Sequence, residues 1–211
     1  MHSHEQARQL ADDLMGRIYV ALRDGDLDAE PVVTLACLLE EAGRSTPATR
    51  ELLERSTAHL TTADVTRLGK RLLRDTRFEP TFTLEPSLWA ALEQALNLVE
   101  HDVRSTGITG TLRLVIPSWD ESGHAWVEFR GSYQGNGIWP AQGSDPQAAL
   151  MSVADATQEV IMEMLWKAWP ICPAHDRGLR AELAHKAAVW RCTGDGTHTV
   201  ARVGELLPEH R

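Results

Sequence analysis

The stretch Gly110-Thr-Leu-Arg-Leu-Val-Ile-Pro-Ser-Trp-Asp-Glu-Ser-Gly-His-Ala-Trp-Val-Glu-Phe-Arg130 decides the fold class, because the spacing of apolar residues changes there. Before it, apolar residues recur at the helical period; within it, they alternate as in strands. Residues 111–116 and 124–130 therefore predict two strands joined by a turn at 118–123. We expect an α+β protein: a helical N-terminal half, then a small antiparallel sheet with one long helix and a C-terminal hairpin.

Five helices are predicted before this stretch. Apolar periodicity, first-turn prolines and glycine stops place them at about residues 5–23, 31–43, 46–58, from a cap at Thr62 onward, and 88–103. The segment 77–86 carries two prolines and is expected to be extended. It divides the chain into a helical region, 1–79, and an α+β region, 80–211, although one continuous domain stays possible.

After the first two strands, the sequence predicts a short extended piece near Trp139 and a long helix from Pro146 to about Trp169. A final hairpin, 187–192 and 198–203, is predicted around Gly194-Asp-Gly196.

The composition is that of a soluble globular protein, with 211 residues of which 43% are hydrophobic. The apolar runs are too short to span a membrane and no signal peptide opens the chain, so we expect a cytoplasmic protein without a membrane partner. A net charge of −9 disfavours nonspecific attraction to phosphate backbones or anionic lipid. Three cysteines do not make a disulfide framework, and Cys37 is expected to be buried in a helix.

Two Cys-His pairs near the C-terminus predict a metal site. Cys172 and His175 have two intervening residues, and Cys192 and His198 have five, which are turn formers. Thiolates and imidazoles are the preferred ligands of tetrahedral Zn²⁺. The arrangement resembles zinc-ribbon and zinc-finger sites in ligand type and spacing, but the Cys-His, Cys-His order implies no particular family. Four protein ligands would make the zinc structural.

Two other interpretations of these four residues stay open. In the first, the thiols are buried, the histidines are exposed and no metal binds, because short ligand motifs also arise by chance. Alternatively, if His198 points away, water could take its place, with Asp176 or Asp195 as a nearby base. That arrangement would suit a hydrolase-like zinc enzyme.

A polar face is predicted on the second strand. Alternation places Ala125, Val127 and Phe129 on one side and puts four residues of another kind on the opposite side: His124, Trp126, Glu128 and Arg130. Such a face could bind a partner. A solvated face with Trp126 covered by a loop is the plainer interpretation.

A basic surface is predicted on the helices within residues 47–77. Its cations on the fourth helix are Arg67, Lys70, Arg71 and Arg74. The short connection between the third and fourth helices is similar to that of a helix-turn-helix, so nucleic-acid binding is an alternative function. The acidic net charge makes nucleic acid the less favoured partner.

The sequence lacks glycine-rich phosphate loops, His-Glu-x-x-His and Gly-x-Ser-x-Gly motifs, while six of its seven tryptophans follow Gly110. We therefore expect a noncatalytic, zinc-stabilised binding or accessory protein that acts through protein contacts. Its partner would be another protein or a second copy of itself. An enzymatic function is the less favoured alternative.

Overall fold

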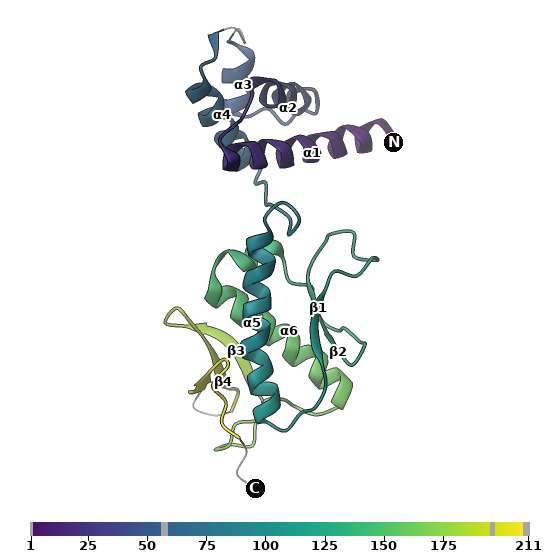
Figure 1. Cartoon of the computed structure of the whole chain (residues 1–211), viewed down its shortest axis with the longest axis vertical. Coiled ribbons are helices and arrows are strands. Elements are labelled where there is room, and N and C mark those ends of the chain that lie inside the picture. Colours follow the sequence, from purple (N-terminus) through teal and green to yellow (C-terminus); the bar gives the residue numbers. More distant parts are fainter. Residues whose placement is uncertain (1, 56–58, 195–196, 209–211) are drawn as a thin grey trace. The chain divides into compact units, whose positions relative to one another are not determined.

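The protein has mixed α+β structure, as predicted (Figure 1). The computed structural model describes residues 2–55, 59–194 and 197–208. The chain divides into two compact units, Met1–Pro80 and Thr81–Arg211. Each unit has a hydrophobic core of its own. No helix among the described residues is both long enough and apolar enough to cross a membrane.

The first unit is helical. It contains α1 (His2–Asp24), α2 (Ala29–Glu41), α3 (Pro47–Leu53) and α4 (Thr62–Asp75). Apolar residues at helical spacing on α1, α2 and α4 form its core; Ile18, Leu35 and Leu68 are completely buried. Burial of such side chains drives the helices together, at about 1.5–3 kcal/mol for each.

Three predictions for the first unit need correction. Helix α3 ends at Leu53, before the predicted end near residue 58, and residues 56–58 lie outside the described part. Helix α4 is capped by Thr61, whose hydroxyl accepts from the Asp64 amide while the Asp64 carboxylate accepts from the Thr61 amide. Cys37 lies in α2 as predicted, but its side chain is exposed.

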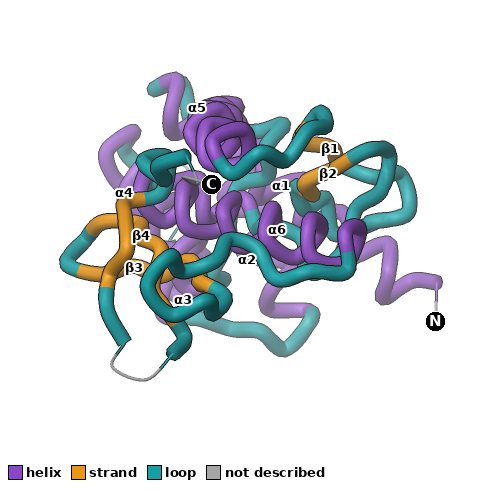
Figure 2. The backbone as a smooth tube through the Cα atoms, turned by 90° about the horizontal axis from the view of Figure 1, so that it is seen from below, coloured by secondary structure: helices purple, strands orange, loops and turns teal. Residues whose placement is uncertain are grey.

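The second unit is built on two helices. Helices α5 (Pro86–Ser105) and α6 (Pro146–Leu165) lie side by side. A two-stranded sheet pairs β1 (Leu112–Val115) with β2 (Trp126–Phe129), and a three-stranded sheet has the order β3 (Leu179–Ala184), β4 (Ala187–Cys192), β5 (Thr199–Arg202). All pairings are antiparallel. Both views place the two sheets on opposite sides of α6 (Figures 1 and 2).

The second unit also differs from the prediction in detail. Near Trp139 there is a single bridge between Ala125 and Ile138, followed by the short 3-10 helix η2 (Pro140–Ser144). Helix α6 ends at Leu165, not near residue 169, because Trp166 adopts a left-handed conformation (φ 51°). Strand β3 is not predicted from the sequence. The turn residues 195–196 of the last hairpin lie outside the described part.

Two buried polar side chains join the second sheet to the helices. The carboxylate of Asp102 on α5 accepts hydrogen bonds from the Trp190 indole and from the amides of Gly204 and Leu206. The amide of Gln158 on α6 donates to the backbone oxygens of Trp169 and Leu179. These bonds hold the start of β3, β4 and the segment after β5 against the two helices.

Candidate metal centre

The structure brings the two predicted Cys-His pairs together. The ligand atoms of Cys172, His175, Cys192 and His198 all lie within 4.8 Å of one another. Cys172 and His175 lie in the turn before β3, Cys192 ends β4, and His198 immediately precedes β5. The cluster therefore joins three consecutive segments of the second sheet at one end.

Three sulfur-nitrogen separations within this four-residue cluster are close to those expected between ligands of one metal ion. The Cys172 Sγ lies 3.6 Å from the His175 Nδ1 and 3.7 Å from the His198 Nε2. The Cys192 Sγ lies 3.5 Å from the His175 Nδ1. With Zn–S bonds of about 2.3 Å and Zn–N bonds of about 2.1 Å, tetrahedral S and N ligands lie about 3.6 Å apart. The four ligand atoms thus lie close enough together to bind one metal ion.

The backbone around the cluster is folded to present these side chains. The carbonyl of Cys172 accepts hydrogen bonds from the amides of His175 and Asp176, which closes a tight turn between the first two ligands. Asp176 takes a left-handed conformation (φ 50°) and lets the chain reverse into β3. At the second pair, the amide of Gly194 donates to the Cys192 sulfur over 3.4 Å.

Burial differs between the thiols and the imidazoles. Cys172 and Cys192 are part of the hydrophobic core, with exposed fractions of 0% and 1%, whereas His175 is exposed and His198 half-buried. Ligand sulfurs surrounded by apolar side chains are protected from water, so the site has a dry inner side and a wet outer side. The four ligand atoms are near one another in space as well as in sequence, and the pattern of buried thiols with a more exposed pair of imidazoles is present.

The open-site alternative required His198 to point away, but its Nε2 faces the Cys172 sulfur. Asp176, one of the two candidate bases, is exposed and does not belong to the ligand cluster. Asp195, the other, lies outside the described residues. If all four side chains bound one tetrahedral ion, no position would be left for a substrate or a reacting water.

The predicted alternation of β2 is present. Ala125, Val127 and Phe129 are buried, whereas His124, Trp126 and Glu128 are half-buried and Arg130 is exposed, with its guanidinium over the Phe129 ring. Two residues of the predicted partner-binding face are held by ionic or polar contacts: Glu128 pairs with Arg113 at 2.6 Å, and the Arg130 guanidinium donates to the Thr109 carbonyl.

The other two residues of this face belong to an aromatic surface. The Trp126 indole donates to Asp120 and packs against Trp119 and Tyr133, at centroid distances of 5.0 and 6.2 Å. The hydrogen bond from Trp126 holds the pKa of Asp120 below its usual range. His124 stacks on Trp139 at 4.3 Å.

Trp119 and Trp139 are the exposed members of this aromatic surface, with exposed fractions of 54% and 57%. The sequence does not place them beside β2, because both lie in loops without periodicity. Only their residue type, common in protein interfaces, points to a binding role.

The basic surface on α4 is partly neutralised. Arg67 and Arg71 form ion pairs with Glu51 at 2.6 and 2.7 Å, and Arg67 also lies 3.3 Å from Asp64. The hydrogen bond from Arg67 lowers the pKa of Glu51, which therefore stays ionised. These pairs reduce the positive charge that a nucleic acid would meet. Lys70 and Arg74 have no ion pair among the described side chains.

The chain matches no protein-family model, no curated protein and no solved structure.

Proposed function

We propose that this chain is a noncatalytic binding or accessory protein whose second unit is stabilised by a structural zinc ion at Cys172, His175, Cys192 and His198. The convergence of the four ligand atoms within 4.8 Å carries the proposal. Two thiolates and two imidazoles favour zinc over harder cations such as Mg²⁺ or Ca²⁺. The ion would contribute folding free energy rather than chemistry.

The partner surface is proposed to be the aromatic surface formed by Trp119, Trp126, Tyr133 and Trp139. Interfaces are enriched in tryptophan and tyrosine because these side chains bury large areas while a polar group can still form hydrogen bonds. Here two indoles are more than half exposed. A protein partner that covers them is therefore favoured, and free thiols at the metal site are consistent with work in the cytoplasm.

Elemental analysis of the purified chain tests the zinc. Wild type should contain about one zinc per chain, and Cys172→Ser and Cys192→Ser should contain little, because each removes a ligand. Cys37→Ser is the matched control, since Cys37 is exposed on α2 in the first unit. A chelator should lower the melting temperature of wild type by about 10 °C or more. Metal-free wild type with the same melting temperature would refute the structural site.

Cobalt substitution separates the structural site from an open one. A closed site should give a tetrahedral Co²⁺ absorption spectrum that added azide leaves unchanged. An azide-dependent change would favour the hydrolase-like alternative instead.

Affinity capture tests the partner surface. Proteins that bind wild type should be lost with Trp119→Ser/Trp139→Ser and kept with Trp166→Ser, because Trp166 is 89% exposed but follows the end of α6, outside the loops that carry Trp119 and Trp139. Equal loss with both variants would show that exposed tryptophan in general, not this surface, causes the binding.

A further inference from the structure

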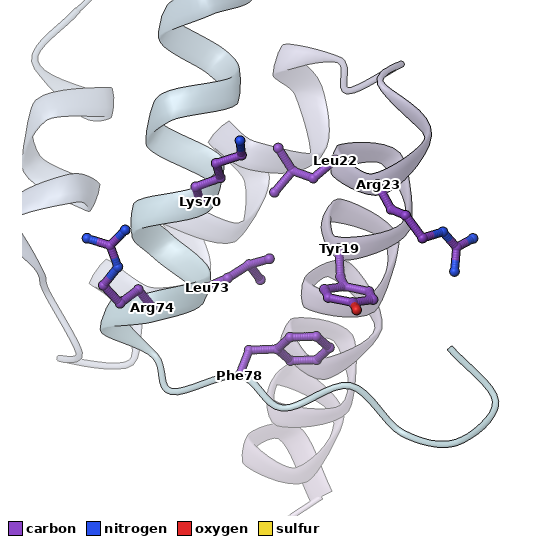
Figure 3. A pocket seen from close by; sticks show the side chains of 7 residues that line it. All are labelled: Tyr19, Leu22, Arg23, Lys70, Leu73, Arg74 and Phe78. Carbon is purple, nitrogen blue, oxygen red and sulfur yellow. The ribbon is translucent and has the colours of Figure 1, made fainter. Parts of the chain in front are cut away.

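The first unit has a hollow of about 390 Å³ between α1 and α4. Its middle is apolar: Leu22 and Leu73 lie across from each other, next to Tyr19 and Phe78 (Figure 3). The rings of Tyr19 and Phe78 pack with centroids 5.8 Å apart. A hollow of this size is large enough for one large apolar side chain.

Cations surround this apolar hollow. Arg23 lies on its α1 side, and Lys70 and Arg74 lie on its α4 side (Figure 3). Arg23 already forms an ion pair with Asp24 at 2.9 Å. Lys70 and Arg74 make no such pair among the described side chains, so they carry the uncompensated charge of the rim. In a protein with a net charge of −9, this is a local reversal of sign.

A second hollow continues from the first along the outer surface of α4. It measures about 610 Å³, and it shares Lys70 and Arg74 with the first hollow. Its other cations, Arg67 and Arg71, are held by Glu51. The two hollows together therefore suit an extended occupant rather than a compact one, with the strongest positive charge where they meet.

We propose that these two hollows form a docking site for an acidic peptide segment of a partner protein. One large apolar side chain of the segment occupies the first hollow, and carboxylates on either side of it pair with Lys70 and Arg74. An apolar anchor surrounded by charge pairs is the usual composition of an interface hot spot. A nucleic acid would satisfy the two cations through phosphate but would leave the apolar hollow uncovered. This site lies in a different unit from the zinc cluster and goes beyond the proposed function.

Peptide display on the full-length chain tests the proposal. A library of random short peptides is selected on wild type and counter-selected on Lys70→Glu/Arg74→Glu. The selected peptides should carry a large apolar residue flanked by Asp or Glu. A labelled selected peptide should bind the double variant at least about 10-fold more weakly, because two attractive pairs become repulsive. Arg8→Glu/Arg17→Glu is the matched control: it makes the same charge change on exposed positions of α1 outside the hollows and should bind like wild type.

A second variant tests the apolar anchor. Phe78→Ala removes one wall of the first hollow and should also weaken the peptide at least about 10-fold, whereas Leu10→Ala, at an exposed position of α1, should not. Thermal melting of each variant confirms folding. Selected peptides without acidic enrichment, or with equal affinity for Lys70→Glu/Arg74→Glu, would overturn the proposal. So would an oligonucleotide whose binding depends on Lys70 and Arg74 when no displayed peptide binds.

Discussion

The carboxylate of Asp102 accepts a hydrogen bond of 2.7 Å from the indole nitrogen of Trp190, which lies 88 residues further along the chain. Both side chains are completely buried. Two backbone amides, those of Gly204 and Leu206, donate to the same carboxylate. One side chain of α5 thereby fixes β4, which ends at the ligand Cys192, and the segment after β5, which follows the ligand His198.

Replacing Asp102 should destabilise the protein. Asp102→Ala leaves three buried donors without an acceptor and should lower the free energy of unfolding by about 2–4 kcal/mol. Trp190→Phe removes one donor and keeps the other two hydrogen bonds. The part of the loss in unfolding free energy that comes from hydrogen bonding should therefore be smaller than for Asp102→Ala. Urea unfolding of zinc-loaded protein measures both. An Asp102→Ala variant as stable as wild type would mean that the carboxylate does not hold this region.

The same carboxylate predicts a pH dependence. Burial raises the pKa of Asp102, although three hydrogen bonds to its ionised form oppose the shift. A raised folded-state pKa gives stability that is complete below the unfolded pKa and is lost as the pH rises through the folded one. The advantage of wild type over Asp102→Asn should therefore decrease with rising pH. Unfolding curves of both chains at matched zinc saturation check this, and an advantage that grows with pH contradicts it.

Gln158 offers a test of the link between α6 and the backbone around the metal cluster. Gln158→Glu puts a carboxylate against the two carbonyl oxygens that now accept from the amide, so the variant should lose about 2–4 kcal/mol at neutral pH. Gln158→Met, of similar size, loses the bonds without adding repulsion and should cost less. Equal losses of unfolding free energy in the two variants would show that Gln158 stabilises this region only by the volume of its side chain.

Gly135 lies against α6. A Cβ at this position would come within 1.8 Å of the Glu159 carboxylate and 3.0 Å of its Cβ, and the backbone has φ +83°. Gly131 has the same φ but open space around it, so Gly131→Ala measures the backbone cost alone, about 1 kcal/mol. Gly135→Ala should lower the melting temperature further than Gly131→Ala does. Identical shifts would place Glu159 elsewhere in solution.

Glu51 controls the charge of the α4 surface. Wild type should elute from heparin at low salt, because Arg67 and Arg71 are paired with this carboxylate. Glu51→Gln removes the Glu51 pairs of both guanidinium groups and leaves Arg67 its pair with Asp64, so the salt concentration needed for elution should rise. Glu54→Gln, one turn position away and outside these pairs, makes the same change in net charge and serves as the control. Tight retention of wild type at physiological salt would revive the nucleic-acid alternative.

The elements that the sequence predicts best are those with a regular apolar period. Helices α1, α4 and α5 and the alternation of β2 follow from it directly. The metal cluster is also predictable, because its ligands come in two local pairs and only one reversal of the chain must bring them together. Strand β3 is not: its turn uses His185 and Lys186 at positive φ, a geometry that sequence rules associate with glycine and asparagine.

Contacts between segments that are far apart in the chain cannot be predicted from local sequence patterns, for a physical reason. Trp119 and Trp139 meet β2 only through the course of two irregular loops, which no period encodes. Asp102 does leave a signal, since it interrupts the apolar face of α5 between Val99 and Val103. A carboxylate at such a position requires buried donors. The sequence cannot say that they come from the C-terminal segment.

The position of Cys192 at the end of β4, opposite Leu179 in the β3–β4 ladder, has a consequence for folding. Neighbouring residues of a strand face opposite sides, so a slip of one residue in this hairpin would turn Cys192 away from Cys172 and His175. A metal ion that needs Cys192 on the same face of the hairpin as the other ligands could bind only when the β3–β4 register is correct. The metal would then stabilise the native register of the hairpin selectively. Hairpins with a shifted register would not bind the metal, so they could separate and pair again.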